Sequence, residues 1–152
     1  MQKGLFIVIS GPSGVGKGTI CSKLLKKLDA WYSVSMTTRE MRKGEQEGVD
    51  YYFVDKDTFE EIIRNNEFLE YAVYNDCYYG TPKDIVLEKL NRGIDVFTEI
   101  DIQGARQIKS LYANAILFYI LPPSMEELEQ RLYQRATESV EDIQKRLMIA
   151  YQ

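Results

Sequence analysis

The sequence predicts an α/β fold: a parallel sheet flanked by helices, with a mixed α/β lobe inserted in the chain and a short lid near its end. Apolar runs at residues 5–9 and 115–121 predict strands of that sheet, because strands covered on both faces read as continuous apolar segments. Residues 94–100 predict a further buried strand, although Asp95, Thr98 and Glu99 interrupt its apolar residues. Amphipathic segments separate these runs, and this alternation is typical of parallel α/β sheets. Residues 33–81 interrupt it with a cluster of tyrosines, so we expect them to form the inserted lobe.

Each element before and within the lobe has a local signal. A helix is predicted after Lys17, because its apolar residues fall on one face: Ile20, Cys21, Leu24, Leu25 and Leu28. The lobe is predicted to contain extended residues 33–38, a polar loop at 40–50, a short strand at 51–54 and irregular strands at 67–79. Asp57 and Glu60 form a capping-box-like start for a helix whose inner face carries Phe59, Ile62 and Ile63.

The elements after the lobe are marked by caps and breakers. Thr81 and Pro82 predict an N-cap and first helical residue, and Gly93 predicts the end of that helix. A further helix is predicted after the strand at 94–100. Ser124 with Glu127, and Ser139 with Asp142, predict the starts of the last two helices. Their predicted inward residues are Met125, Leu128, Leu132, Val140, Ile143 and Leu147.

Composition excludes several classes of function. The 152 residues include no histidine and only two cysteines, which rules out histidine-dependent catalysis and a structural zinc site. A net charge of −4 disfavours a polynucleotide partner. No apolar run approaches the ~20 residues of a transmembrane helix, and the first run does not resemble a signal peptide. We therefore expect a cytoplasmic protein with reduced thiols and no membrane partner; its oligomeric state stays open.

The strongest functional signal lies between the first predicted strand and the first predicted helix, where the chain matches the phosphate-loop pattern G-x-x-x-x-G-K. Glycines let backbone N–H groups approach a polyphosphate, the helix N-terminus adds a partial positive charge, and Lys17 adds a cation. The predicted ATP phosphate-binding residues are Gly11, Pro12, Ser13, Gly14, Val15, Gly16, Lys17, Gly18 and Thr19.

A magnesium ion would accompany ATP, and no direct protein ligand is predicted for it. Gly18 stands where the pattern has Ser or Thr, so Thr19 or water takes that place, or the nucleotide itself holds the ion, as is common for Mg²⁺. Glu99 and Asp101 follow a predicted strand at the edge where ligands of open α/β sheets bind. They are candidates for water-mediated contacts with Mg²⁺ or an acceptor hydroxyl; two solvated acids would give the same pattern.

Arginines concentrate in two places, and phosphoryl transfer needs cations around both substrates. Arg39 and Arg42 lie in the polar loop of the lobe, whereas Arg131, Arg135 and Arg146 surround the break between the last two helices. Such groups indicate bidentate phosphate clamps, although any one of them alone fits a solvated surface charge.

Several motifs, in the same order, resemble those of the guanylate kinase family over the whole chain. Besides residues 11–19, they are Ser33–Arg39 with Arg42, Gly44–Glu45, Asp50–Tyr51, Glu67–Tyr71, Tyr78–Thr81, Glu99–Gly104 and Leu121–Ser124. The resemblance implies a phosphate-loop nucleotide kinase that transfers a phosphoryl group from ATP to GMP with Mg²⁺. Gly18 and the non-glycine neighbours of Arg135, Gln134 and Ala136, depart from the family pattern, and the latter two bear on lid motion.

The resemblance also implies residue roles. The implied catalytic residues are Lys17, Arg39, Arg131, Arg135, Arg146 and Asp101, the last lying between acceptor and metal. The implied GMP-binding residues are Arg39, Arg42, Tyr51 and Tyr79 for the phosphate, Ser35, Glu70 and Thr81 for the guanine, and Glu99 and Asp101 beside them. Glu70 suits guanine chemically, because one carboxylate can accept both N1–H and the 2-amino group. From the residues alone, an exposed acid on an edge strand is an equal alternative.

We expect a single domain, with a core at 1–32 and 82–125, the GMP-binding lobe at 33–81, and the lid with its following helix at 126–152. The run at 115–121 would form an unpaired sheet edge, which is an aggregation hazard. The last helix also runs to the final residue, so a further strand and helix that complete the adenine pocket are expected beyond it.

Three functions fit these observations to different degrees. A GMP kinase is favoured. A phosphopeptide-binding module, like the guanylate-kinase-like domains of membrane-associated scaffolds, would tend to lose the phosphate loop, which here keeps Lys17 and its glycines. Another small-nucleotide kinase would need a different base pocket.

Overall fold

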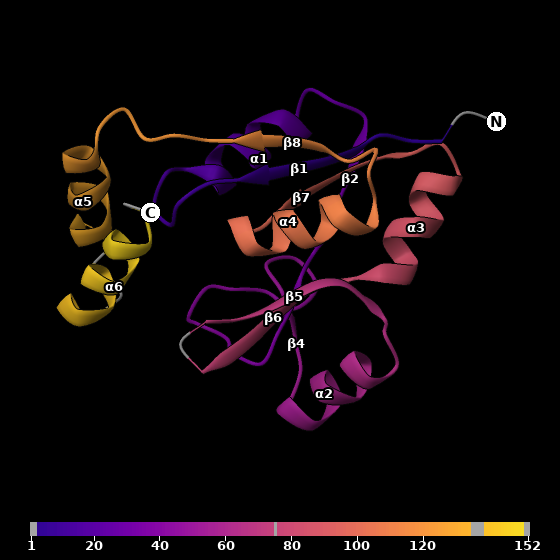
Figure 1. Ribbon diagram of the computed structural model, residues 1–152, viewed down its shortest axis with the longest axis horizontal. Helices are drawn as coiled ribbons and strands as arrows, with labels where there is room; N and C mark the ends of the chain where they lie inside the picture. The colour runs from indigo at the N-terminus through magenta and orange to yellow at the C-terminus, as the bar shows by residue number, and fades with distance from the viewer. Residues whose placement is uncertain (1–2, 75, 135–138, 151–152) are drawn as a thin grey trace.

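Helix α4 (Ile102–Leu111) lies between two sheets and contacts strands of both (Figure 1). The computed structural model describes residues 3–74, 76–134 and 139–150. Within these ranges each sheet has four strands. Helices α5 (Met125–Gln134) and α6 (Val140–Ala150) stand together at one end of the molecule, and α3 (Lys83–Asn91) lies at the other. The predicted α/β class, a parallel sheet flanked by helices, is confirmed.

The first sheet is parallel throughout, with strand order β2-β7-β1-β8. Its strands are β2 (Ala30–Tyr32), β7 (Asp95–Glu99), β1 (Phe6–Ser10) and β8 (Ile116–Tyr119). Ile9 pairs with Glu99 and Ser10 with Tyr119, so the carboxyl ends of three strands meet at one edge of the sheet. The three predicted segments form strands, and β2 adds a fourth that the pattern did not single out.

The second sheet mixes parallel and antiparallel strands in the order β4-β3-β6-β5. Its strands are β3 (Met36–Thr37), β4 (Tyr52–Phe53), β5 (Phe68–Tyr74) and β6 (Cys77–Pro82). Strands β5 and β6 pair from Tyr74–Cys77 to Phe68–Pro82, with a register shift between Phe68 and Glu70. The prediction of irregular strands at 67–79 is therefore confirmed: the segment forms most of a long hairpin, and its irregularity is the register shift.

Two helices begin elsewhere than the sequence predicted. These two are α2 (Lys56–Arg64) and α3; the remaining helix, α1, spans Lys17–Leu25. The N-cap of α2 is Asp55, whose carboxylate accepts the N–H of Thr58, so the predicted start at Asp57 was two residues late. Thr81 does not cap α3, because its hydroxyl donates to Glu70 instead.

The caps of the last two helices are confirmed. Ser124 and Ser139 each accept the backbone N–H three residues later. The predicted inward positions of Leu28 and Val140 were wrong: their exposed fractions are 46% and 57%. Leu28 lies beyond the end of α1, and Val140 is the first residue of α6, where a turn has no neighbouring turn to pack beside it. None of the helices in the described ranges has the length and apolar character that a membrane span requires.

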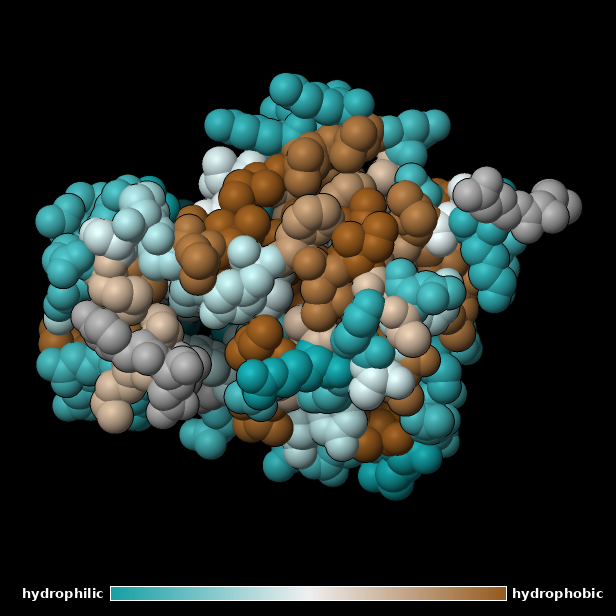
Figure 2. Space-filling model, turned by 45° about the horizontal axis from the view of Figure 1, so that its top comes forward, coloured by the Kyte–Doolittle hydropathy of each residue, from teal (hydrophilic) through white to brown (hydrophobic). Residues whose placement is uncertain are grey.

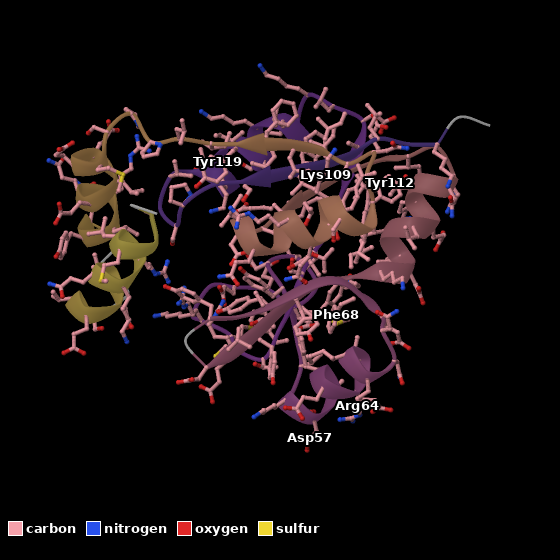
Figure 3. The ribbon with its side chains drawn as sticks, in the orientation of Figure 1. Asp57, Arg64, Phe68, Lys109, Tyr112 and Tyr119 are labelled. Carbon is pink, nitrogen blue, oxygen red and sulfur yellow. The ribbon has the colours of Figure 1, made fainter. Side chains whose placement is uncertain are left out.

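Apolar side chains pack α3 and α4 against the first sheet, and aromatic side chains pack α2 against the second sheet. The core between the first sheet, α3 and α4 contains Phe6, Val8, Leu69, Val86, Leu90, Val96 and Ile108. A separate aromatic stack holds α2 on the second sheet: the ring of Phe59 lies 4.4 Å from that of Phe68 and 5.1 Å from that of Tyr78, between centroids. Phe68 projects from β5 toward α2 (Figure 3).

Strand β8 forms one edge of the first sheet, as the sequence predicted, and its side chains are exposed. Between 37% and 53% of each side chain in Ile116–Tyr119 faces solvent, and apolar surface gathers in this region (Figure 2). Within the described residues, no strand pairs with the outer side of β8.

We expect the aromatic stack to carry much of the second sheet's stability. Phe59 is fully buried, so Phe59→Ala should leave a cavity and lower the free energy of unfolding by about 3–5 kcal/mol. Urea denaturation measures this loss. Val73→Ala on the exposed face of β5 is the control and should change stability by less than ~0.5 kcal/mol. Equal effects of the two substitutions would contradict the packing argument.

Candidate functional site

The phosphate loop follows β1 and ends at the first residue of α1. Gly14 and Gly16 have φ of +85° and +104°, a region that residues with a Cβ rarely adopt. At Gly14 a Cβ would also lie 2.8 Å from Cδ2 of Leu132. The Nζ of Lys17 donates to the carbonyls of Gly11 and Pro12, at 2.9 and 3.2 Å. These bonds fold the ammonium group back over the loop.

The lid helices are packed onto this loop. The apolar cluster that joins them contains Val15, Leu128, Leu132, Ile143 and Leu147. Two of the predicted arginines lie on these helices and contact the loop. Arg131 donates to the carbonyl of Val15 at 3.2 Å, and Arg146 donates to the hydroxyl of Ser13. The guanidinium of Arg146 also lies 5.0 Å from the ring centroid of Tyr74, on β5. Arg135 lies outside the described residues.

An open cavity of about 350 Å³ lies beside the loop. Gly14, Gly16, Thr19, Arg131 and Gln134 line it. It therefore combines backbone of the phosphate loop, a hydroxyl and a guanidinium, which are groups that bind phosphate oxygens.

The two predicted acids, Glu99 and Asp101, lie at the carboxyl end of β7 but contact different helices. Glu99 faces α1, where its Oε2 is 3.3 Å from the position that a Cβ on residue 18 would take, so Gly18 leaves it room. Burial, and then the negative charge of Glu99, raise the pKa of the neighbouring Cys21 thiol to about 12, so this cysteine stays protonated. Asp101 is the N-cap of α4, and its Oδ1 accepts the N–H of Gly104 at 2.8 Å.

Metal ligands are sparse around these acids. Across the described ranges, no three cysteine, aspartate or glutamate side chains gather to form a metal site. Thr19, Glu99 and Asp101 provide oxygen donors near the loop, which are the donor type that Mg²⁺ accepts.

A second group of predicted residues meets on the inserted lobe. Arg39 forms a two-pronged ion pair with Glu45, at 3.0 Å from NH1 to Oε2 and 2.7 Å from NH2 to Oε1. The guanidinium lies 5.5 Å from the ring centroid of Tyr51, whose ring contacts that of Tyr79 at 5.9 Å. Burial raises the pKa of Tyr51. These four residues therefore bring together a guanidinium, the carboxylate that pairs with it, and two phenols.

Glu45 was not among the predicted site residues. Besides pairing with Arg39, its Oε2 accepts the backbone N–H of Arg42 at 2.8 Å. The hydrogen bond from Arg39 is the main cause of the lowered pKa of Glu45. The sequence signal that could have identified Glu45 is its position three residues after Arg42 and six after Arg39.

Glu70 is buried between the second sheet and α4. Only 5% of the residue is exposed, and its Oε1 accepts the hydroxyl of Thr81 at 2.5 Å. Burial raises the pKa of Glu70 to about 7, with a contribution from the charge of Asp101, while the bond from Thr81 opposes the rise. The alternative of an exposed acid on an edge strand is wrong. Ser35 lies half-buried before β3, and its carbonyl accepts the N–H of Tyr52.

These features can be compared with known proteins. The family model described as guanylate kinase matches residues 3–152. The guanylate kinase of Clostridium tetani is 55% identical over 99% of this chain and 73% of its own length. This chain belongs to the guanylate kinase family. The guanylate kinase of Carboxydothermus hydrogenoformans is 52% identical over the whole of this chain and 75% of its own.

A solved guanylate kinase also shares the fold. The crystal structure of guanylate kinase from Anaplasma phagocytophilum superimposes with a TM-score of 0.77 at 34% identity. The match covers 97% of this chain and 71% of that one. The guanylate kinase family, predicted from the order of the motifs, is thus confirmed by sequence and by structure.

Glu70 should make the stability of this family member depend on pH. Its pKa rises from 4.5 to about 7 on folding, so the folded protein binds more protons between these values. The resulting stabilisation is complete below pH ~4.5 and is lost as pH rises through about 7, a loss of about 3 kcal/mol for a rise of this size. Glu70→Gln should remove this dependence in urea denaturation from pH 5 to 8. The exposed control Glu40→Gln should keep it, and parallel curves for wild type and Glu70→Gln would contradict the assignment.

Proposed function

We propose that the chain catalyses phosphoryl transfer from ATP to GMP, giving ADP and GDP. Guanylate kinase relatives at about half identity support ATP-dependent phosphorylation of GMP. The observation that carries the proposal is the position of two unlike sites around α4: a phosphate loop with arginines over it, and a buried carboxylate with a hydroxyl. The first suits the donor, and the second suits a base that offers two adjacent donors.

On the donor side, the loop and lid would bind and neutralise the triphosphate. Backbone N–H groups of residues 11–19 would bind its oxygens, with Lys17 as the cation at the β and γ phosphates. Arg131 and Arg146, which already contact the loop, would stabilise the charge that spreads over the transferring group. Arg135 is proposed for the same role on the family pattern alone.

On the acceptor side, the lobe would hold GMP at both ends. Arg39, Arg42, Tyr51 and Tyr79 would bind its phosphate, because a guanidinium matches phosphate oxygens in a two-pronged arrangement. Ser35, Glu70 and Thr81 would bind the guanine. Asp101 would orient the acceptor oxygen in line with the donor, with Glu99 beside it.

Magnesium is proposed as the cofactor bound with ATP. The scattered oxygen donors fit an ion held mainly by phosphates and water, since Mg²⁺ commonly keeps part of its hydration shell. Thr19 is the proposed protein hydroxyl nearest to it, with Glu99 and Asp101 acting through water. When bound, the ion would neutralise charge on the phosphates.

We further propose a cytoplasmic location, small-molecule substrates and no polynucleotide or membrane partner. The unpaired state of Cys21 and Cys77 supports a reducing compartment, and the net charge of −4 argues against a polyanionic partner.

The test of the proposed function is ADP release, coupled to a reporter, with ATP, Mg²⁺ and each of GMP, AMP, UMP and CMP. We expect turnover with GMP to exceed that with the other nucleotides by roughly 10⁴-fold, because a buried site that hydrogen-bonds its ligand rejects mismatched partners to about that extent. Equal turnover with AMP would favour another nucleotide kinase. Absence of ADP release in every arm would favour a binding module.

Lys17→Met should abolish most turnover while leaving the fold intact. The side chain is bonded to loop carbonyls rather than packed in a core, and its loss removes a cation that follows the charge of the transferring group. We expect kcat to fall on the order of 10²–10³-fold. Steady-state kinetics with a thermal unfolding control measures this, and unchanged kcat would refute the role of Lys17.

Glu70→Gln should weaken GMP binding without affecting ATP. The amide would accept one guanine donor but would set its own NH₂ group against the other. The KM for GMP should rise roughly 10–100-fold, with the KM for ATP unchanged. An equal rise in both KM values would mean that Glu70 has a structural role only.

A further inference from the structure

The carboxylate of Glu70 lies directly against the first turn of α4. A Cβ built on Gly104 would be 2.4 Å from Oε2 of Glu70 and 2.9 Å from its Cδ, closer than any real Cβ approaches an oxygen. Both contacted atoms belong to a side chain that is 5% exposed and that Thr81 holds at its other oxygen. Gly104 is itself buried in the helix, and its φ is ordinary. Space for the carboxylate, rather than backbone freedom, therefore requires glycine here.

A second residue of α4 fixes how closely the helix approaches the strand. Gln107, one turn after Gly104, accepts the N–H of Tyr71 at 3.2 Å and donates to the carbonyl of Tyr71 at 2.9 Å. Tyr71 follows Glu70 on β5. The amide of Gln107 therefore bonds the N–H and the carbonyl of the residue next to Glu70, on the outer edge of the hairpin. The helix and the strand are thereby joined in one register beside Glu70.

The same turn of α4 also orients the acid at its start. The N–H of Gly104 donates to Oδ1 of Asp101 at 2.8 Å. One residue thus contacts both the carboxylate proposed for the base and the carboxylate proposed for the acceptor oxygen. A shift of this turn would change both positions at once.

We propose that Gly104 and Gln107 are positioning residues for base selection: they hold the Glu70 carboxylate where both of its oxygens reach a purine that carries N1–H and an adjacent amino group. The inference rests on the proposed function. Each carboxylate oxygen has two lone-pair directions, so Oε1 can keep Thr81 while it accepts a base donor. The contact with Gly104 sets the plane in which the second acceptor lies.

The direct test is Gly104→Ala, compared with Ser110→Ala on the exposed part of the same helix. Alanine favours the helix, so the expected defect comes from displacement of Glu70. We expect the KM for GMP to rise roughly 10–100-fold, the KM for ATP to stay within about twofold of wild type, and the preference for GMP over IMP, which lacks the amino group, to shrink. Ser110→Ala should leave all three values unchanged. An unchanged GMP/IMP preference in folded Gly104→Ala would overturn the proposal.

A double mutant separates positioning from a general packing defect. In the Glu70→Gln background, Gly104→Ala should raise the KM for GMP by less than about twofold further. The side chain that the new methyl group displaces is then an amide, which already fails to accept both guanine donors. Full multiplication of the two effects would overturn the proposal.

If Gly104→Ala does not fold, Gln107→Ala decides, since it removes the bonds to β5 without adding atoms. A raised KM for GMP with a smaller GMP/IMP preference supports the proposal, and wild-type values overturn it. A wild-type protein without GMP-dependent ADP release would refute the proposed function instead, which is a different outcome.

Discussion

The contact between α4 and β5 sets the distance between the two halves of the site. On one side, α4 follows β7, and the pairing of β7 with β1 brings the start of α4 beside the phosphate loop. On the other side, Gln107 bonds the backbone of β5, and Gly104 lets the Glu70 carboxylate lie against the helix. Phosphoryl transfer depends mainly on positioning. Helix α4 contacts strands of both sheets and so fixes how the two candidate sites lie relative to each other.

The phosphate loop depends on a second packing relation, between Gly14 and the lid. Leu132 occupies the space where a Cβ on residue 14 would lie, and Val15 enters the same apolar cluster. Gly14 has a positive φ, and the lid helices pack beside it through the same apolar cluster. Arg131 and Arg146 therefore reach the loop because their helices are packed on it, so the spacing of the charges follows from an apolar contact.

Much of the fold and part of the site could be predicted from the sequence because the signals were local. Continuous apolar runs predicted β1 and β8, a segment rich in apolar residues predicted β7, and a glycine pattern between strand and helix predicted the phosphate loop. The errors came from tertiary context. Val140 fits a helical stripe but is the first residue of its helix, and Thr81 fits an N-cap but bonds Glu70. Gln107 had no local signal at all, since its partner is 36 residues away in the chain.

The burial of Glu70 illustrates how a functional requirement opposes stability. A carboxylate removed from water favours its neutral form, and the pKa of about 7 reflects this. A neutral acid would satisfy Thr81 and cost the fold less, yet it would present a donor where a guanine also presents donors. Recognition of the base, as proposed for Glu70, would therefore require the charged form that the unliganded fold disfavours. Binding of a ligand with two donors would stabilise that form, so the pKa of Glu70 should fall when the base binds. If the proposed role of Glu70 holds, its carboxylate would be fully hydrogen-bonded only with the ligand bound, as is expected where a site departs from the rules that govern a core.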